Sequence, residues 1–350
     1  MATTVLFTWD VAPALRARLR AQLGDLGLAL VFPDVDPDAV PEDDQGGSGD
    51  GAAEPRPEAL RALAADADVL VGWRYDDALL DAAPRCRLCV NPGAGVQHLT
   101  ELFGRRAEAP TLVNSHGNAW LTAQGAVALL LALAHRVAFH DRRFRAGAWQ
   151  DDLVARSHPA RPLRRRRLGL LGYGHIGKAI HRLLSGWEMD VHALRTGWPE
   201  GAPAGVTAHT ELAPFLAEAE VLVVALPLTP ETEGMLDAEA LGRLPAGALL
   251  LNVGRGPVLD EDALWDALES GQLAGAALDV WWDYRPEPDA EGRRYPSRRP
   301  FHTRQDVLCS PHRAAGPFDD LERWDDVAEN LRRFAEGRPL MHVVDPARGY

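Results

Sequence analysis

The chain has 350 residues, of which 46% are hydrophobic and 25% charged, a composition typical of a globular protein large enough for two domains. Its 37 basic and 50 acidic side chains give a formal net charge of −13, which disfavours nucleic acid and anionic membranes as partners. No apolar stretch approaches the roughly 18–20 residues that span a bilayer, and three cysteines favour a reducing, cytoplasmic location. Cys86 and Cys89 form a lone CxxC pair, so we expect no metal site.

The first hundred residues alternate between apolar strands and helices, which indicates a parallel sheet. Strands are expected at 5–7, 28–32, 68–71 and 88–90, and helices at 13–23 and 60–65. Residues 122–140 are mostly Ala and Leu and predict one long helix, apolar on most faces. Such a helix is hard to bury within one domain, so we expect a domain boundary near Asn118 and a homodimer. A second alternating run follows, with strands expected at 168–171, 191–194, 221–226, 249–253, 276–280 and 307–309.

A glycine motif opens this second run. Gly172, Gly174 and Gly177 form GxGxxG between an apolar strand and a helix. The first glycine allows a tight turn, the second lets a pyrophosphate approach the backbone, and the third permits close helix packing. The run also fits a P-loop ending at Lys178, but Ala179 stands where the magnesium-binding hydroxyl belongs. The motif therefore predicts a dinucleotide site at Gly172, Tyr173, Gly174, His175, Ile176 and Gly177.

The predicted fold is α/β, with two Rossmann-like doubly wound parallel-sheet domains. The dinucleotide-binding domain (118–312) is inserted in the substrate-binding domain (1–117 and 313–350). About 20 residues beyond the glycines, where an acidic residue normally binds the ribose, the chain has Arg195. An arginine can pair with a 2′-phosphate, so we favour NADP over NAD. A surface arginine at a strand end is the alternative.

In its motifs the chain resembles the D-isomer-specific 2-hydroxyacid dehydrogenases, which include glycerate/hydroxypyruvate reductases, formate dehydrogenase and phosphonate dehydrogenase. The resemblance runs from about Gly93 to Gly316. It implies an oxidoreductase that transfers hydride between a nicotinamide and a small 2-hydroxy or 2-oxo acid. The motifs that carry it, in the family's order, are GYGHIG from Gly172, LPLTPET from Leu226, LNVGRG from Leu251, ALDV from Ala277 and SPH from Ser310.

Two side chains at expected strand ends suit the chemistry. The guanidinium of Arg255 can hold a carboxylate with two hydrogen bonds while polarising the neighbouring carbonyl. The imidazole of His312 can protonate the carbonyl oxygen, or act as the base in reverse. The resemblance assigns both residues these roles, and it places the substrate carboxylate on backbone N–H groups of Ala94 and Gly95. It adds to the cofactor site Leu226, Pro227, Thr232, Val253 and Asp279, the last as the partner of the nicotinamide amide.

The chain departs from the family at one position. In relatives a glutamate partners the histidine, five residues after the aspartate of the Leu-Asp-Val motif, and here that position is Tyr284. Either Asp283 or Glu287 replaces this carboxylate, or none does. Without one, reduction should fade at a lower pH than in relatives, because an adjacent carboxylate favours the protonated imidazole and a tyrosine does not.

Two alternatives to a 2-oxo acid reductase stay open. One is a dehydrogenase that acts on a phosphonate-like anion. The other is a dinucleotide-sensing corepressor, which would not need Arg255 and His312 together. The sequence names neither the small anionic substrate nor a role for Arg74, which either overhangs the substrate cleft or belongs to a surface loop.

Overall fold

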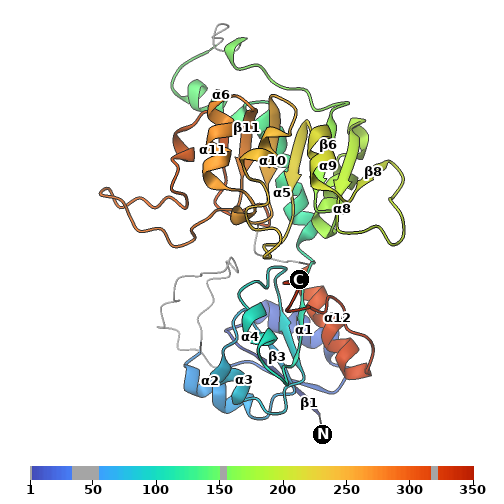
Figure 1. Ribbon diagram of the computed structural model, residues 1–350. Coiled ribbons are helices and arrows are strands. Elements are labelled where there is room, and N and C mark those ends of the chain that lie inside the picture. The colour runs from blue at the N-terminus through green and yellow to red at the C-terminus, as the bar shows by residue number, and fades with distance from the viewer. Residues whose placement is uncertain (1, 34–54, 150–155, 317–321) are drawn as a thin grey trace. The chain divides into compact units, whose positions relative to one another are not determined.

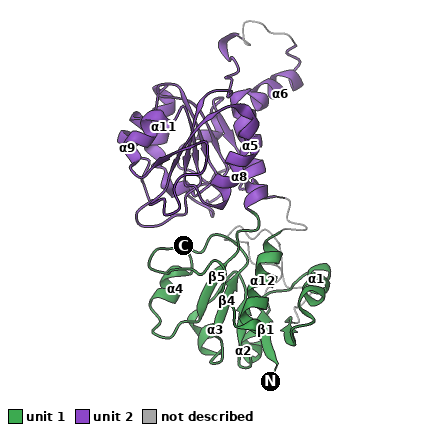
Figure 2. Cartoon of the chain, turned by 90° about the vertical axis from the view of Figure 1, so that its right-hand side faces the viewer, with its two compact units in different colours: residues 1–118, 317–350 green, residues 119–316 purple. Residues whose placement is uncertain are grey.

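The computed structural model describes residues 2–33, 55–149, 156–316 and 322–350 (Figure 1). The chain forms two compact units, Met1–Asn118 with Pro317–Tyr350, and Ala119–Gly316 (Figure 2). The second unit is inserted in the sequence of the first. Residues 313–316, expected in the first unit, lie with the second, where the N–H groups of Arg313 and Ala314 bond to Asp279.

The first unit contains a five-stranded parallel sheet in the order β2-β1-β3-β4-β5. Its strands are β1 (Thr3–Phe7), β2 (Leu28–Val31), β3 (Val69–Val71), β4 (Leu88–Asn91) and β5 (Thr111–Asn114). The helices of this unit are α1 (Pro13–Leu23), α2 (Pro57–Ala64), α3 (Asp77–Asp81), α4 (Thr100–Gly104) and α12 (Arg323–Glu336).

The second unit contains a seven-stranded parallel sheet in the order β12-β11-β10-β9-β6-β7-β8. Its strand order reverses between β6 and β9, and in doubly wound sheets ligands bind at the carboxyl ends of the strands at such a reversal. The strands are β6 (Arg167–Leu171), β7 (Asp190–Leu194), β8 (Val206–His209), β9 (Val221–Val224), β10 (Ala248–Asn252), β11 (Leu273–Leu278) and β12 (Val307–Cys309). The helices are α5 (Ala119–Ala134), α6 (Val137–Arg145), α8 (His175–Leu183), α9 (Leu212–Glu218), α10 (Ala238–Gly242) and α11 (Glu261–Glu269), with short 3₁₀ turns at Ser185–Trp187, Gly256–Val258 and Phe301–Thr303.

The central strands of this sheet are apolar on both sides, because helices cover both faces. Along β9, Leu222 and Val224 pack with the residues of α9, α10 and α11, whereas Val221 and Val223 pack with those of α5 and α8. Alternate side chains of a strand point to opposite faces, so a continuous apolar run is what a doubly covered strand requires.

The expectation of one long helix at 122–140 is wrong. The chain forms α5 and α6 with a bend of 64° between them. Arg136, at the break, has a left-handed backbone (φ +54°), and its guanidinium donates to Ala274 O at 2.9 Å. One face of α5, including Ala126 and Leu130, is buried against the sheet of its own unit. Among the described helices none is by itself long and apolar enough to cross a membrane, and α5 with α6 meets that criterion only as a bent pair.

Two strands were not predicted. Both β5 and β8 are short edge strands, and β8 (Val-Thr-Ala-His) contains a single large apolar residue. The predicted strands at 221–226 and 276–280 end earlier, at Val224 and Leu278. The residues beyond those two ends form loops, and these loops carry candidate site residues.

Candidate active site

In the second unit, most of the predicted site residues follow the carboxyl ends of strands. Because all seven strands are parallel, these ends meet at one edge of the sheet, where ligands bind in open α/β folds. The residues in question are Gly172 after β6, Arg195 after β7, Leu226 after β9, Arg255 after β10, Asp279 after β11 and His312 after β12.

The glycine loop has the geometry of a dinucleotide cradle. Gly172 has φ +100°, and a Cβ at Gly177 would lie 2.3 Å from Gly172 O, so both positions require glycine. A Cβ at Gly174 would meet no atom within 4 Å, and this exposed residue precedes the first turn of α8. Space beside a helix N-terminus suits a pyrophosphate, so the residues present fit a dinucleotide.

Trp198, which was not predicted, connects Arg195 with the glycine loop. The Arg195 guanidinium lies 5.5 Å from the centre of the Trp198 ring, and that ring lies 5.6 Å from the Tyr173 ring. The Trp198 indole donates to His209 O at 3.1 Å, which fixes its orientation. Tyr173 is buried, and its hydroxyl is hydrogen-bonded to His181 Nδ1 at 2.7 Å. Tyr173 therefore contributes packing, whereas the next residues of the motif become exposed at His175 and half-buried at Ile176.

The loop after β9 is held in shape by hydrogen bonds among its own residues. The Thr232 hydroxyl donates to Pro227 O at 2.7 Å and accepts from Thr229 N at 2.8 Å. A Cβ at Gly254 would lie 2.6 Å from Leu226 O, so this loop and the loop after β10 touch through their backbones. Val253 is buried beside this contact. The structure therefore gives Thr232 a part in shaping the loop.

Arg255 is held by its own backbone and by Asn252. The Asn252 amide donates to Arg255 O at 2.9 Å, while its oxygen accepts from Gly254 N at 3.0 Å. The Arg255 guanidinium donates to Gly254 O at 2.7 Å. Burial lowers the pKa of Arg255, and the neighbouring Tyr284 acts in the opposite direction. Arginine stays protonated in proteins, so this is a partly desolvated cation.

The Asp279 carboxylate fixes the loop that carries His312. It accepts hydrogen bonds from the Ser310 hydroxyl, from Arg313 N at 2.8 Å and from Ala314 N at 3.1 Å. These donors lie on both sides of His312, whose backbone is left-handed (φ +57°). In this structure the carboxylate predicted to hold a nicotinamide amide is engaged with the loop of the predicted acid.

Tyr284 lies beside the imidazole. Its ring centre is 5.5 Å from that of His312, with 54° between the ring planes. Both carboxylate candidates are exposed, and Asp283 Oδ1 accepts from Arg285 N at 2.8 Å within its own turn. The structure therefore shows Tyr284 in aromatic contact with His312, whereas the Asp283 carboxylate is engaged in a local turn.

In the first unit, two asparagines shape the predicted carboxylate loop. The Asn91 amide donates to Gly93 O at 2.7 Å and to Gly95 O at 3.2 Å, and the Asn114 amide donates to Ala94 O at 2.7 Å. With these carbonyl groups engaged, the N–H groups of Ala94 and Gly95 are the donors that the loop can offer to an anion. Arg74 is an exposed residue of the same unit.

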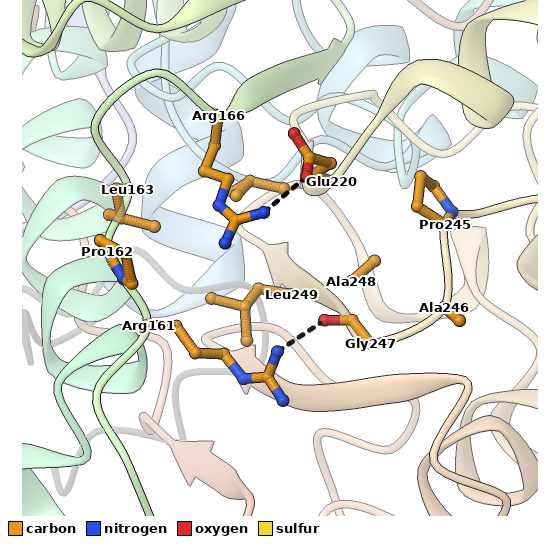
Figure 3. Close-up of a pocket in the computed structure, with 11 residues that line it drawn as sticks. Arg161, Pro162, Leu163, Arg166, Glu220, Pro245, Ala246, Gly247, Ala248 and Leu249 are labelled. Carbon is orange, nitrogen blue, oxygen red and sulfur yellow. Dashed lines mark hydrogen bonds and ion pairs between the residues drawn. The ribbon is translucent and has the colours of Figure 1, made fainter.

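A cavity of about 90 Å³ lies at the opposite edge of the second sheet (Figure 3). It is lined by residues that precede β6 and by residues before and at the start of β9 and β10, and within it Arg166 pairs with Glu220 at 2.7 Å. Small-molecule sites typically occupy roughly 300–1,000 Å³. The cavity is too small and at the wrong end of the strands to be the dinucleotide site.

Comparison with known proteins gives the family. Residues 127–314 match the model of the D-isomer specific 2-hydroxyacid dehydrogenase NAD binding domain. A glyoxylate reductase of Thermococcus kodakarensis is 32% identical over 294 residues, which cover 80% of this chain and 84% of that protein. The chain belongs to this family. It is an NAD(P)-dependent oxidoreductase of 2-hydroxy and 2-oxo acids.

Two further relatives agree with this assignment. The crystal structure of a D-isomer specific 2-hydroxyacid dehydrogenase from Xanthobacter autotrophicus Py2, in complex with NADPH and MES, matches over 100% of both chains with a TM-score of 0.75 and 29% identity. A D-3-phosphoglycerate dehydrogenase of Mycobacterium leprae is 31% identical over 300 residues, which cover 83% of this chain and 53% of that protein.

Replacing Asp279 by Asn is expected to destabilise the enzyme and to displace His312. The change removes a buried charge that accepts three donors and turns an amide N–H towards them. We expect a loss of about 2–3 kcal/mol in the free energy of unfolding, measured in urea, and a fall in kcat of at least about tenfold. Asp283→Asn, at an exposed position, is the matched control and should behave like the parent. Equal behaviour of the two variants would contradict the role given to Asp279.

Proposed function

We propose that this enzyme reduces a small 2-oxo acid, such as glyoxylate or hydroxypyruvate, with NADPH as the preferred donor. The observation that carries the proposal is that the loops of Arg255 and His312 both adjoin the loop of Tyr284 at the carboxyl edge of the second sheet. The Tyr284 ring lies 5.5 Å from the His312 ring, and a Cβ at Gly256 would lie 2.1 Å from Trp281 O. Two relatives bear the names glyoxylate reductase and hydroxypyruvate reductase, which supports this substrate class. The inserted unit is the dinucleotide-binding domain and the other unit the substrate-binding domain.

Each residue has one task in this proposal. Arg255 binds the substrate carboxylate through two parallel hydrogen bonds and polarises the adjacent carbonyl, and the N–H groups of Ala94 and Gly95 also bind the carboxylate. When bound, the reduced nicotinamide supplies the hydride that reaches the carbonyl carbon. His312 in its protonated form then gives its proton to the carbonyl oxygen, and in the oxidation direction it accepts that proton.

His312→Ala is expected to lower kcat for reduction by about 10²–10⁴-fold, the usual contribution of a general acid. In the parent, kcat/KM for reduction should fall as the pH rises, because only the protonated ring can donate, and this limb should vanish in the variant. His302→Ala is the matched control, since His302 stacks on Tyr295 at 3.7 Å and has no part in the proposal. Near-normal rates in His312→Ala would refute the mechanism.

The preference for NADPH rests on Arg195. This cation stands at the end of the strand next to the glycine loop, and Trp198 holds it towards that loop. A guanidinium there matches a 2′-phosphate in charge and geometry. The Xanthobacter structure was obtained with NADPH, which agrees with this preference.

Arg195→Asp is expected to reverse the cofactor preference. We expect the parent to favour NADPH over NADH by about 10–100-fold in kcat/KM. This factor corresponds to the free energy of one or two charge-assisted hydrogen bonds to the 2′-phosphate. The aspartate should repel the 2′-phosphate and accept from the ribose hydroxyls of NADH. Arg182→Asp, which replaces an exposed arginine of α8, is the control and should leave the ratio unchanged. Equal efficiencies with both cofactors in the parent would argue against the assignment.

We also propose a homodimer, with α6 and residues 146–149 as the contact surface. Val137, Phe144 and Trp149 are exposed by 53%, 59% and 71%, and the last two rings touch at 5.9 Å between their centres. Large apolar side chains exposed together favour a protein contact. Because α5 buries one face within its own unit, α6 rather than α5 is the surface available for pairing.

Light scattering at micromolar concentration is expected to give the mass of a dimer for the parent. The double variant Phe144→Asp, Trp149→Asp should give the mass of a monomer, because it places charge in the contact. Leu63→Asp introduces the same charge at a 39% exposed apolar residue of the first unit and should stay dimeric. A monomeric parent would rule out the dimer.

We place the enzyme in the cytoplasm, where thiols stay reduced. All three cysteines are free of disulfides, and the Sγ atoms of Cys86 and Cys89 share a hydrogen bond at 3.9 Å. Burial raises the pKa of Cys309 to about 11, which makes it a poor nucleophile.

A further inference from the structure

We propose that Tyr284 is a substrate-binding residue, whose phenolic hydroxyl donates a hydrogen bond to an oxygen of the 2-oxo acid. It stands where the family has a glutamate, and it would replace an anionic acceptor by a neutral donor. The inference rests on the proposed function of Arg255 and His312 and adds a third group to their site.

The position of Tyr284 is the first argument. Its ring contacts the His312 ring, with 5.5 Å between the centres. Its hydroxyl accepts from Trp281 N, and the Trp281 backbone touches the residue after Arg255, because a Cβ at Gly256 would lie 2.1 Å from Trp281 O. A group beside both the carboxylate clamp and the proton donor is within reach of whatever they hold. Tyr284 also keeps 44% of its surface exposed, so a ligand has access to it.

The hydrogen bonding of the hydroxyl is the second argument. Its oxygen accepts from Trp281 N at 3.4 Å, which leaves the hydroxyl proton for another acceptor. Asp279 also faces Tyr284, but its carboxylate already accepts from Ser310, Arg313 and Ala314. Partial burial raises the pKa of Tyr284, and the hydrogen bond from Trp281 N and the charge of Arg255 act against this, so the phenol stays a neutral donor at physiological pH.

The support of the surrounding loop is the third argument. Tyr284 is the first residue of a loop, residues 284–295, whose two flanking residues are hydrogen-bonded to each other. Asp283 N donates to Pro296 O at 3.1 Å. The residues that follow this loop are bound to α11. There Glu261, which is only 4% exposed, accepts from Arg299 N at 2.6 Å and pairs with Arg298 at 3.1 Å. A side chain on a loop pinned at both ends loses little freedom on binding, as a positioned site residue requires.

The chemistry of the substrate completes the argument. A 2-oxo acid presents a carboxylate and a carbonyl oxygen, and both are acceptors only. A glutamate at this position cannot donate to either in its ionised form, whereas a phenol can. In this enzyme Arg255, Tyr284 and protonated His312 would all be donors directed to the same small anion.

The test is the affinity for oxamate, an unreactive analogue of a 2-oxo acid, measured on the enzyme–NADPH complex by fluorescence titration. Tyr284→Phe keeps the ring and removes the donor, and it should weaken oxamate binding by about tenfold or more, the effect of a hydrogen bond to a charged acceptor. Tyr284→Glu should bind oxamate still more weakly, because it adds repulsion. Tyr295→Phe, in the same loop, is the matched control and should match the parent.

The melting temperature and the NADPH dissociation constant of each variant show whether fold and cofactor site are intact. Parent-like oxamate affinity in Tyr284→Phe, or in Tyr284→Glu, would overturn the inference. Arg255→Ala separates it from the proposed function. If Arg255→Ala loses oxamate binding and Tyr284→Phe does not, only the role of Tyr284 fails, whereas unchanged binding in Arg255→Ala would refute the proposed function itself.

Discussion

The buried carboxylate of Asp279 and the loop around His312 depend on each other. Asp279 is only 2% exposed, and a buried carboxylate without donors is strongly unfavourable. The loop supplies those donors from the Ser310 hydroxyl and from two backbone N–H groups beyond His312. In return the carboxylate holds His312 in a left-handed conformation that few non-glycine residues adopt. The imidazole is thereby fixed next to Tyr284.

Buried polar side chains also order loops through backbone hydrogen bonds where strands end in asparagine. Asn91, Asn114 and Asn252 each stand at the last position of a strand and are buried. Each side chain bonds to backbone groups of a loop that carries a proposed site residue, Ala94 and Gly95 in the first unit and Arg255 in the second. An asparagine can donate and accept at once without bringing charge, so it orders a loop at a sheet edge without altering the electrostatics of an anion site.

Charge is used locally in this enzyme. The net charge of −13 repels anions at a distance, yet the proposed ligands are a dinucleotide phosphate and a 2-oxo acid. Arg195, Arg255 and the N-terminus of α8 supply local positive charge at the carboxyl edge of one sheet. A neutral Tyr284 in place of a glutamate brings no negative charge to that position. Binding would then depend mainly on contacts made inside the site, because the net charge of the chain does not favour anions.

The sequence alone determined the features that depend on residues close together in the chain. Such features are the apolar strands, the turns that follow them, the GxGxxG motif and the strand-end positions of Arg255 and His312. Together they predicted the two parallel sheets and the family. The tertiary structure decided the rest. The break between α5 and α6 depends on Arg136 reaching a carbonyl 138 residues away, the short edge strands β5 and β8 pair only because a neighbouring strand offers its edge, and Tyr284 meets His312 only because β11 and β12 are adjacent. Such contacts join segments that are distant in sequence, and no local pattern records which of them will touch.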